Sequence, residues 1–334
     1  MDSGVRWIGR LNRSRSIREV IDYIDELETQ PFYVARVFHD RDSLASQKPI
    51  RVGELPFLAE NIDVKNFERM VKKSNNLWEI GKFSERINRL SGDIAEKIAP
   101  LVCEKIDKAL SLREVMYCLN QIAGLGFSRC LTSSNRLNNL REYDTLRLMS
   151  LIVEGLDEGK LVGKLAESSR VRDVWECLHI LKLSSEALAQ RVVDALTAET
   201  IEEKLAQTRN PRNVENLLRT LSEISPEKAE HVLQLISKKL ESNKTSNPVS
   251  SATLLAGVAN LHSRMVAMHQ PQLVKRLNSS ESLREVGEAF RKISLCNPSL
   301  ATEIFKKLDE QKQTYLLTKF GRYTKGKPPS ASPV

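Results

Sequence analysis

An arginine recurs at one position of a repeated pattern, and it is the strongest candidate for chemistry in this chain of 334 residues. It stands two residues before an apolar anchor residue in five aligned segments, at Arg18, Arg113, Arg172, Arg212 and Arg284. Each arginine falls in the first turn of an expected helix, where a cation opposes the helix macrodipole at a cost of a few tenths of a kcal/mol. Because an arginine is unfavourable at this position, its recurrence in five segments indicates that it has a specific role.

Two uses fit this arginine. In the first, each arginine pairs with an acidic residue of an adjacent unit and forms a salt-bridge ladder; the candidate partners are Glu19, Glu114, Asp173 and Glu285. In the second, the arginines form a stripe of cations for an anionic partner such as RNA. Equivalent positions in a stacked helical array lie along one edge, about 10 Å apart, so a polyanion can follow them. The sequence leaves both uses open.

A second basic feature covers residues 311–327, which contain no acidic residue. Its candidate RNA-binding residues are Lys312, Lys319, Arg322, Tyr323, Lys325 and Lys327. Basic side chains interleaved with aromatic rings suit single-stranded nucleic acid, because bases stack on the rings. A solvated end-cap helix followed by a frayed tail explains the same residues without RNA.

Motifs for enzymatic chemistry are missing from the sequence. It contains no phosphate-binding GxxxxGK[ST] or GxGxxG loop, no HExxH zinc motif and no GxSxG nucleophile elbow. The five histidines are scattered, and the five cysteines form no CxxC pair, which disfavours a zinc site and a disulfide scaffold. We therefore predict a non-enzymatic protein with no catalytic residue, metal, cofactor or small-molecule substrate. No run of 18 apolar residues is present, so we expect no membrane partner.

The elements that must position these residues follow from an internal repeat. Its anchors are Val20, Ile80, Val115, Val174, Val214 and Val286. Apolar residues recur three, four and seven positions after them, which is the stripe of an amphipathic helix. The fifteenth position after each anchor is small: Ala35, Ala95, Cys130, Ala189, Ala229 and Ala301. Each unit is predicted to be a helix, a turn and a second helix that approaches the first closely.

Helix-start signals agree with this register. Three segments have the Ser-x-x-Glu pattern of a capping box, beginning at Ser16, Ser111 and Ser282. Three other expected helices start with proline in the first position, after Asn210, Ser225 and Asn297.

The anchor spacings set the expected number of repeats. Intervals of 35 and 40 residues, from Ile80 to Val115 and from Val174 to Val214, indicate single units. The wider intervals are expected to hold degenerate units, around residues 55–71, 146–165 and 254–277. About eight or nine such pairs bury their apolar faces only by stacking, so the predicted fold is all-α, an α-solenoid of helical hairpins.

The chain ends differ from this array, which is expected to span residues 16–310. Residues 1–15 are rich in arginine and carry an apolar stripe, which fits either a mitochondrial-type presequence or a terminal helix of the array. Residues 311–334 form the basic, aromatic-bearing segment, and its proline- and serine-rich end is expected to be disordered.

The repeat, with Ser-Leu-Arg-Glu-Val opening a helix and a small residue fifteen positions after the anchor, resembles the octotricopeptide-like helical repeats of organellar RNA-associated proteins. The resemblance covers nearly the whole chain but rests on apolar spacing and caps. It implies a structural or RNA-associated component of an organellar ribonucleoprotein such as a mitochondrial ribosome. The implied partners are RNA, including ribosomal RNA, and protein subunits, and the implied location is mitochondrial, otherwise cytoplasmic. The net charge of +8 is compatible with this. The alternative is a protein–protein scaffold or sensor that holds a peptide or helix on its concave face.

Overall fold

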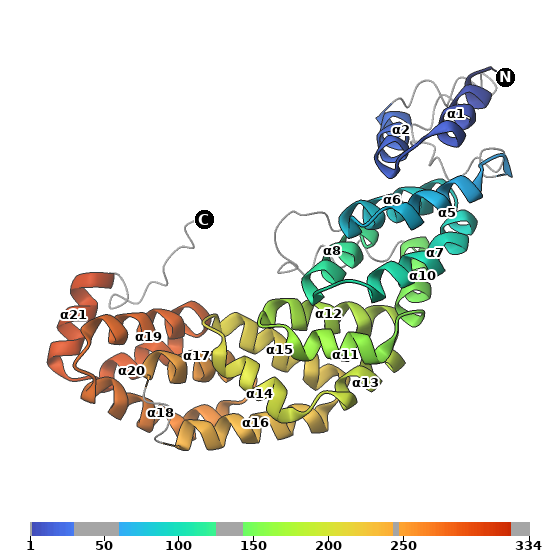
Figure 1. The fold of residues 1–334 in the computed structure, drawn as a ribbon. Helices are drawn as coiled ribbons and strands as arrows, with labels where there is room; N and C mark the ends of the chain where they lie inside the picture. The colour runs from blue at the N-terminus through green and yellow to red at the C-terminus, as the bar shows by residue number, and fades with distance from the viewer. Residues whose placement is uncertain (1, 30–59, 125–142, 243–246, 322–334) are drawn as a thin grey trace, which may run out of the picture. The chain divides into compact units, whose positions relative to one another are not determined.

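The computed structural model describes residues 2–29, 60–124, 143–242 and 247–321 (Figure 1). These ranges form eighteen helices and no strand, which confirms the all-α prediction. The chain divides into two compact units, which we call unit 1 (Met1–Leu165 and Ile180–Leu188) and unit 2 (Ala166–His179 and Ala189–Val334). Within the described ranges, no helix has the length and apolar character needed to cross a bilayer.

In unit 1, helices pack on the second helix along the chain as well as on their sequence neighbours. Thus α2 packs on α6 and α6 on α8, while α5 packs on α7 and α7 on α10. The helices of this unit are α1 (Asp2–Arg13), α2 (Ile17–Thr29), α5 (Val64–Lys73), α6 (Leu77–Leu90), α7 (Gly92–Asp107), α8 (Leu112–Ile122), α10 (Tyr143–Glu154) and most of α11 (Glu158–Glu167). The division between the units falls within α11, α12 (Val171–Ser184) and α13 (Glu186–Ala195).

Unit 2 shows the same alternation more fully. One row of helices runs α15, α17, α19, α21, a second runs α14, α16, α18, α20, and hairpins such as α15–α16 and α19–α20 join them. The bounds are α14 (Ala198–Gln207), α15 (Pro211–Ile224), α16 (Pro226–Glu241), α17 (Pro248–Val258), α18 (Ser263–Ser279), α19 (Leu283–Cys296), α20 (Pro298–Lys307) and α21 (Glu310–Phe320).

Burial confirms the register of the repeat. All six anchors are at most 1% exposed. The small residues at the fifteenth position are equally buried where the structure describes them, at Ala95, Ala189, Ala229 and Ala301. Ala35 and Cys130 lie outside the described residues. Helix pairs α6–α7, α15–α16 and α19–α20 pack together, as expected for a second helix brought close by a small side chain.

The helix starts are also as predicted. The hydroxyls of Ser16, Ser111 and Ser282 accept the backbone N–H three residues on, at 3.2, 3.3 and 3.3 Å. Asn210 and Asn297 cap the proline-led helices α15 and α20 through their side-chain oxygens, whereas Ser225 begins α16 without a side-chain hydrogen bond. These bonds satisfy backbone donors that the first helical turn leaves unpaired.

The 40-residue interval from Val174 to Val214 is not the single hairpin predicted from its length. It holds three helices, α12, α13 and α14, because the chain breaks after Leu196 and restarts at Thr197. The Thr197 hydroxyl accepts the Thr200 N–H at 3.1 Å and caps the new helix. A buried leucine followed by a capping residue makes the same break at Leu156-Asp157 and Leu308-Asp309.

The basic N-terminal segment folds as a helix. Residues 2–13 form α1, which packs on α2 and buries Ile8 and Leu11. The Arg10 guanidinium lies 4.7 Å from the Trp7 ring centroid and 4.3 Å from that of Tyr23.

Helix α17 is the most enclosed helix of unit 2. Its residues 251–258 are all buried, and it packs on both α15 and α19. The closest approach is at Gly257, where an added Cβ would lie 2.4 Å from the Val214 Cβ. Only glycine fits there without displacing α15, so the backbone contact between these helices depends on it.

Candidate nucleic-acid interface

The five recurring arginines lie where the sequence placed them, in the first turns of α2, α8, α12, α15 and α19. All five are exposed, while the anchor two residues later is buried. Two residues correspond to about 200° around an α-helix, which turns the arginine away from the packed face. The slot arginines, as we call Arg18, Arg113, Arg172, Arg212 and Arg284, therefore point to solvent.

Two slot arginines interact with a residue one turn later on their own helix. The Arg172 Nε donates to Glu176 Oε1 at 2.6 Å. Burial raises the pKa of Glu176, and the Arg172 bond opposes that rise. The Arg113 Nε donates to the Tyr117 hydroxyl, and its guanidinium lies 5.3 Å from the centroid of that ring. An arginine beside a half-buried ring such as that of Tyr117 can present a flat cationic surface to a base.

The other three slot arginines have no carboxylate partner within residues 2–29, 60–124, 143–242 and 247–321. Burial raises the pKa of the Cys296 thiol of α19, and Arg212 lies close enough to oppose that rise. The side chains of Arg18 and Arg284 make no hydrogen bond or ion pair with any residue in the ranges that the structure describes. These cations are available to an anionic partner.

Three of the four acidic residues proposed for a ladder make contacts at their own helix starts. Glu19 Oε2 accepts the Arg15 N–H at 2.7 Å, and Glu114 Oε2 accepts the Leu110 N–H at 2.8 Å. Asp173 faces Arg170 at 3.7 Å. Each of these contacts joins residues three or four apart in the sequence, so it is local to one helix start and is not a contact of the predicted ladder.

The second basic feature divides into a folded and an undescribed part. Its residues 311–320 belong to α21, which packs on α19. Lys319 is exposed and donates to the Tyr315 hydroxyl at 2.9 Å, with its ammonium 5.3 Å from that ring centroid. Arg322, Tyr323, Lys325 and Lys327 lie outside the described residues.

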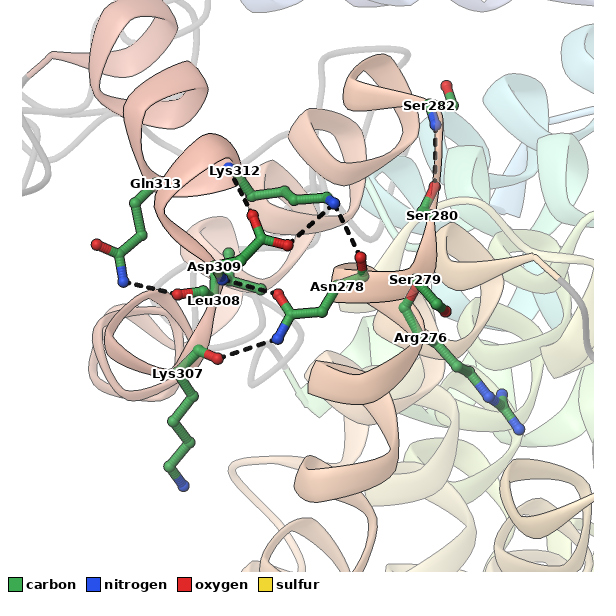
Figure 2. A network of polar contacts seen from close by, with 10 residues as sticks. All are labelled: Arg276, Asn278, Ser279, Ser280, Ser282, Lys307, Leu308, Asp309, Lys312 and Gln313. Atoms are coloured by element: carbon green, nitrogen blue, oxygen red, sulfur yellow. Dashed lines mark hydrogen bonds and ion pairs between the residues drawn. The ribbon is translucent and has the colours of Figure 1, made fainter.

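Lys312 has a structural role instead of a solvent-facing one. It is 7% exposed, and its Nζ donates to the Asn278 carbonyl at 2.8 Å at the C-terminal end of α18 (Figure 2). The same ammonium lies 3.0 Å from Asp309 Oδ2. Asn278 also accepts the Asp309 N–H at 2.9 Å and donates to the Lys307 carbonyl at 3.2 Å. With these partners, Lys312 is not accessible to a phosphate.

Lys312 belongs to a set of cations that the sequence did not reveal. Each donates to backbone carbonyls at the C-terminal end of a helix earlier in the chain, and we call them the capping cations. The cations, each with the helix whose end it caps, are Lys105 (end of α5), Lys164 (end of α7), Lys204 (end of α11), Lys228 (end of α13), Arg276 (end of α16) and Lys312 (end of α18). A cation there satisfies unpaired carbonyls and interacts favourably with the macrodipole.

A weak sequence signal marks four of the capping cations. Each stands directly before a buried aliphatic residue near its helix end, in Lys105-Ile106, Lys164-Leu165, Lys204-Leu205 and Arg276-Leu277. This neighbour fixes the side-chain direction, because the aliphatic residue must face the core. Burial lowers the pKa of Lys204, and Glu203 opposes the shift, which fits an ammonium held partly out of water.

Three of the four described thiols, those of Cys103, Cys118 and Cys177, are buried, and that of Cys296 is half-buried. Burial raises the pKa of Cys103 to about 11 and that of Cys177 to about 12. Such thiols stay protonated at neutral pH and are poor nucleophiles. Across the four ranges of the chain that the structure describes, no group of three histidine, cysteine or acidic side chains could hold a metal ion.

Comparison with known proteins adds no family to this geometry. No protein-family model matches the sequence, and no curated protein matches it significantly.

Proposed function

We propose that this chain is a non-enzymatic α-solenoid that acts as a structural or RNA-associated component of an organellar ribonucleoprotein, such as a mitochondrial ribosome. The alternating rows of helices inside unit 2 support the solenoid part of the proposal, since stacked hairpins are how such repeats bury their apolar faces. RNA and protein subunits are the proposed partners, and mitochondria the proposed location.

The slot arginines are the observation that carries the RNA part of the proposal. They recur at one position, they are exposed, and Arg18, Arg212 and Arg284 lack a carboxylate partner among the described residues. A first-turn cation gains nothing from the helix it stands on. A chain of phosphates supplies the opposite charge that the helix does not.

The salt dependence of binding tests the proposal directly. The full chain is titrated into a fluorescently labelled oligouridylate, and anisotropy is followed at several salt concentrations. Five phosphate contacts predict a slope of log affinity against log salt of about −3.5, so that a fourfold rise in salt weakens binding on the order of a hundredfold. Absence of binding at low salt would contradict the RNA proposal and favour the protein–protein scaffold.

A charge-matched pair of variants separates the slot from general basicity. Arg18→Gln with Arg284→Gln is expected to reduce the steepness of the slope by about 1.4. Lys65→Gln with Lys275→Gln removes the same charge at exposed positions, one in each unit, and is expected to leave the slope nearly unchanged. Equal losses in both pairs would argue against a role for the slot.

A further inference from the structure

A cluster of cations forms in unit 2 where the start of α15 meets the second half of α19. The Lys292 Nζ donates to the Arg209 carbonyl, joining segments 83 residues apart in the sequence. Arg209 and Arg291 both lie close enough to act electrostatically on Lys292. Arg212 stands three residues after Arg209, at the start of α15, and lies close enough to Cys296 of α19 to oppose the rise that burial causes in the pKa of that thiol. Three of the four side chains, those of Arg209, Arg212 and Arg291, are exposed.

Polar side chains fix the two segments against each other. Asn260, which follows α17, donates to the Cys296 carbonyl at 3.4 Å and accepts from the Asn297 side chain at 3.3 Å. The cluster is therefore anchored to the body of unit 2 and does not depend on a free loop. A rigid arrangement of cations loses less entropy on binding an anion than mobile side chains do.

The acidic residues near the cluster do not balance it. Glu215 is already engaged, because its carboxylate accepts hydrogen bonds from Arg219 at 2.7 Å and from Asn260 at 3.4 Å. Glu288 raises the pKa of Lys292, but burial is the larger influence and lowers it, and Arg291 and Arg209 lower it further. Repulsion among these cations is thus not fully relieved inside the chain.

We propose that Arg209, Arg212, Arg291 and Lys292 form a phosphate-binding site that holds the backbone of single-stranded RNA. This inference rests on the proposed function and makes it specific, since it places the tightest contact at the α15–α19 junction instead of spreading it evenly over the slot. Arginine guanidinium groups recognise phosphate oxygens through paired N–H donors. A phosphodiester and a free phosphate ion share this chemistry, so the test must separate them.

The central experiment uses the full chain with Arg209→Gln and Arg212→Gln. Only side chains change, since the Arg209 carbonyl and the Arg212 N–H keep their structural bonds. Loss of two phosphate contacts is expected to weaken oligouridylate binding roughly 25-fold at about 0.1 M salt and to reduce the salt slope by about 1.4. Arg264→Gln with Lys275→Gln, two exposed cations of α18, is the charge-matched control and is expected to change affinity less than about threefold.

Each further arm has a defined meaning. Arg209→Lys with Arg212→Lys keeps the charge that sets the salt slope and is expected to restore most of that slope. A slope as shallow as that of the Arg→Gln pair, with an unchanged circular dichroism spectrum and unfolding midpoint, would overturn phosphate contact by these side chains. An equal loss of RNA affinity in the Arg264/Lys275 control variant would overturn the proposal that the cluster is a specific phosphate-binding site. Thermal stabilisation of the wild-type chain by inorganic phosphate, without oligouridylate binding, would show a free-anion site and overturn the RNA assignment.

Failure of this inference can be told apart from failure of the proposed function. If the wild-type chain binds RNA steeply and the Arg209/Arg212 variant binds as well as wild type, the site is wrong and the proposed function stands. If the wild-type chain binds no RNA at low salt, both fail together.

Discussion

The two ends of the helices use basic side chains in opposite ways. At C-terminal ends, capping cations such as Lys105 and Arg276 reach back to carbonyls of an earlier helix. At N-terminal turns, slot arginines such as Arg18 and Arg284 face solvent without a partner among the described residues. The helix macrodipole favours a cation at the first location and disfavours it at the second. Position on the helix, more than charge itself, thus separates the cations that hold the fold together from those available to a partner.

Removing a capping cation is expected to have the largest effect on stability and is the most demanding test of this difference between the two helix ends. Arg276→Met would leave the carbonyls of Leu240 and Ser242 without their donor, as well as the Ser251 hydroxyl. We expect the free energy of unfolding to fall by about 2–3 kcal/mol, measured by urea denaturation followed by circular dichroism. Lys275→Met, on the exposed side of the same helix, is the control and is expected to change stability by less than about 0.5 kcal/mol. A similar loss of stability in both variants would mean that Arg276 contributes no more to stability than an exposed cation of the same helix does.

Lys312 gives a second and smaller break, because it stands in the last described helix. Lys312→Met removes one carbonyl contact and the ion pair with Asp309, and we expect a loss of about 1–2 kcal/mol. Lys319→Met on the same helix changes an exposed side chain and is expected to be nearly neutral. If Lys312→Met instead left stability intact and weakened RNA binding, the original assignment of this residue to the RNA interface would be right.

Acid pH tests the capping cations against a buried histidine. Lysine and arginine keep their charge when the pH falls, whereas a buried neutral histidine takes up a proton. His269 on α18 is 2% exposed, and its Nε2 lies 2.8 Å from the Ser237 hydroxyl. Burial lowers its pKa, opposed by Glu241 and assisted by Arg276. The His269 imidazole binds a proton more readily in the unfolded chain than in the folded chain. The stability that comes from keeping His269 neutral is therefore present above about pH 6.5 and is lost as the pH falls through the lower pKa of the folded state.

The measurement is the denaturant midpoint at several pH values between about 7.5 and 5. Wild type is expected to lose stability over this range because the unfolded chain takes up the His269 proton more readily than the folded chain does. His269→Gln should flatten that part of the profile, whatever its stability at neutral pH. An identical pH profile in the variant would rule out this histidine as the source.

The smallest expected effect is at the slot itself. Arg284→Gln removes an exposed first-turn cation that opposes the dipole of α19, so stability should stay within about 0.5 kcal/mol of wild type or rise slightly. Thermal unfolding of the two proteins side by side checks this. A clear loss of stability would show that the slot arginines are structural after all, as the ladder interpretation held.

Much of the helical framework could be predicted from the sequence, because it rests on local signals. The anchor spacing gave the buried stripes around Val20 and Val286, and the Ser-x-x-Glu segments gave the starts of α2, α8 and α19. These features depend on residues within one or two turns of each other, which periodicity and capping rules describe well.

Features that depend on distant neighbours could not be predicted. The role of Lys312 is set by Asn278, 34 residues earlier, and the sequence shows only that Lys312 is basic. The break at Leu196-Thr197 was missed because the 40-residue interval resembled a single hairpin. The cluster around Arg209 and Lys292 joins residues 83 apart, a pairing that follows from the packing of α15 with α19 and not from any local pattern.

The enclosure of α17 has a consequence for how the chain folds during synthesis. Its apolar surface needs α19 as well as α15, yet α19 ends 38 residues after α17 does (296 − 258). At about 5–20 residues per second, the ribosome takes roughly 2–8 seconds to supply that cover. Over that time the nascent chain carries an uncovered apolar helix, which is the kind of segment that chaperones bind and that aggregates when they do not. Translation speed and chaperone supply during this interval therefore bear on the yield of folded protein through α17.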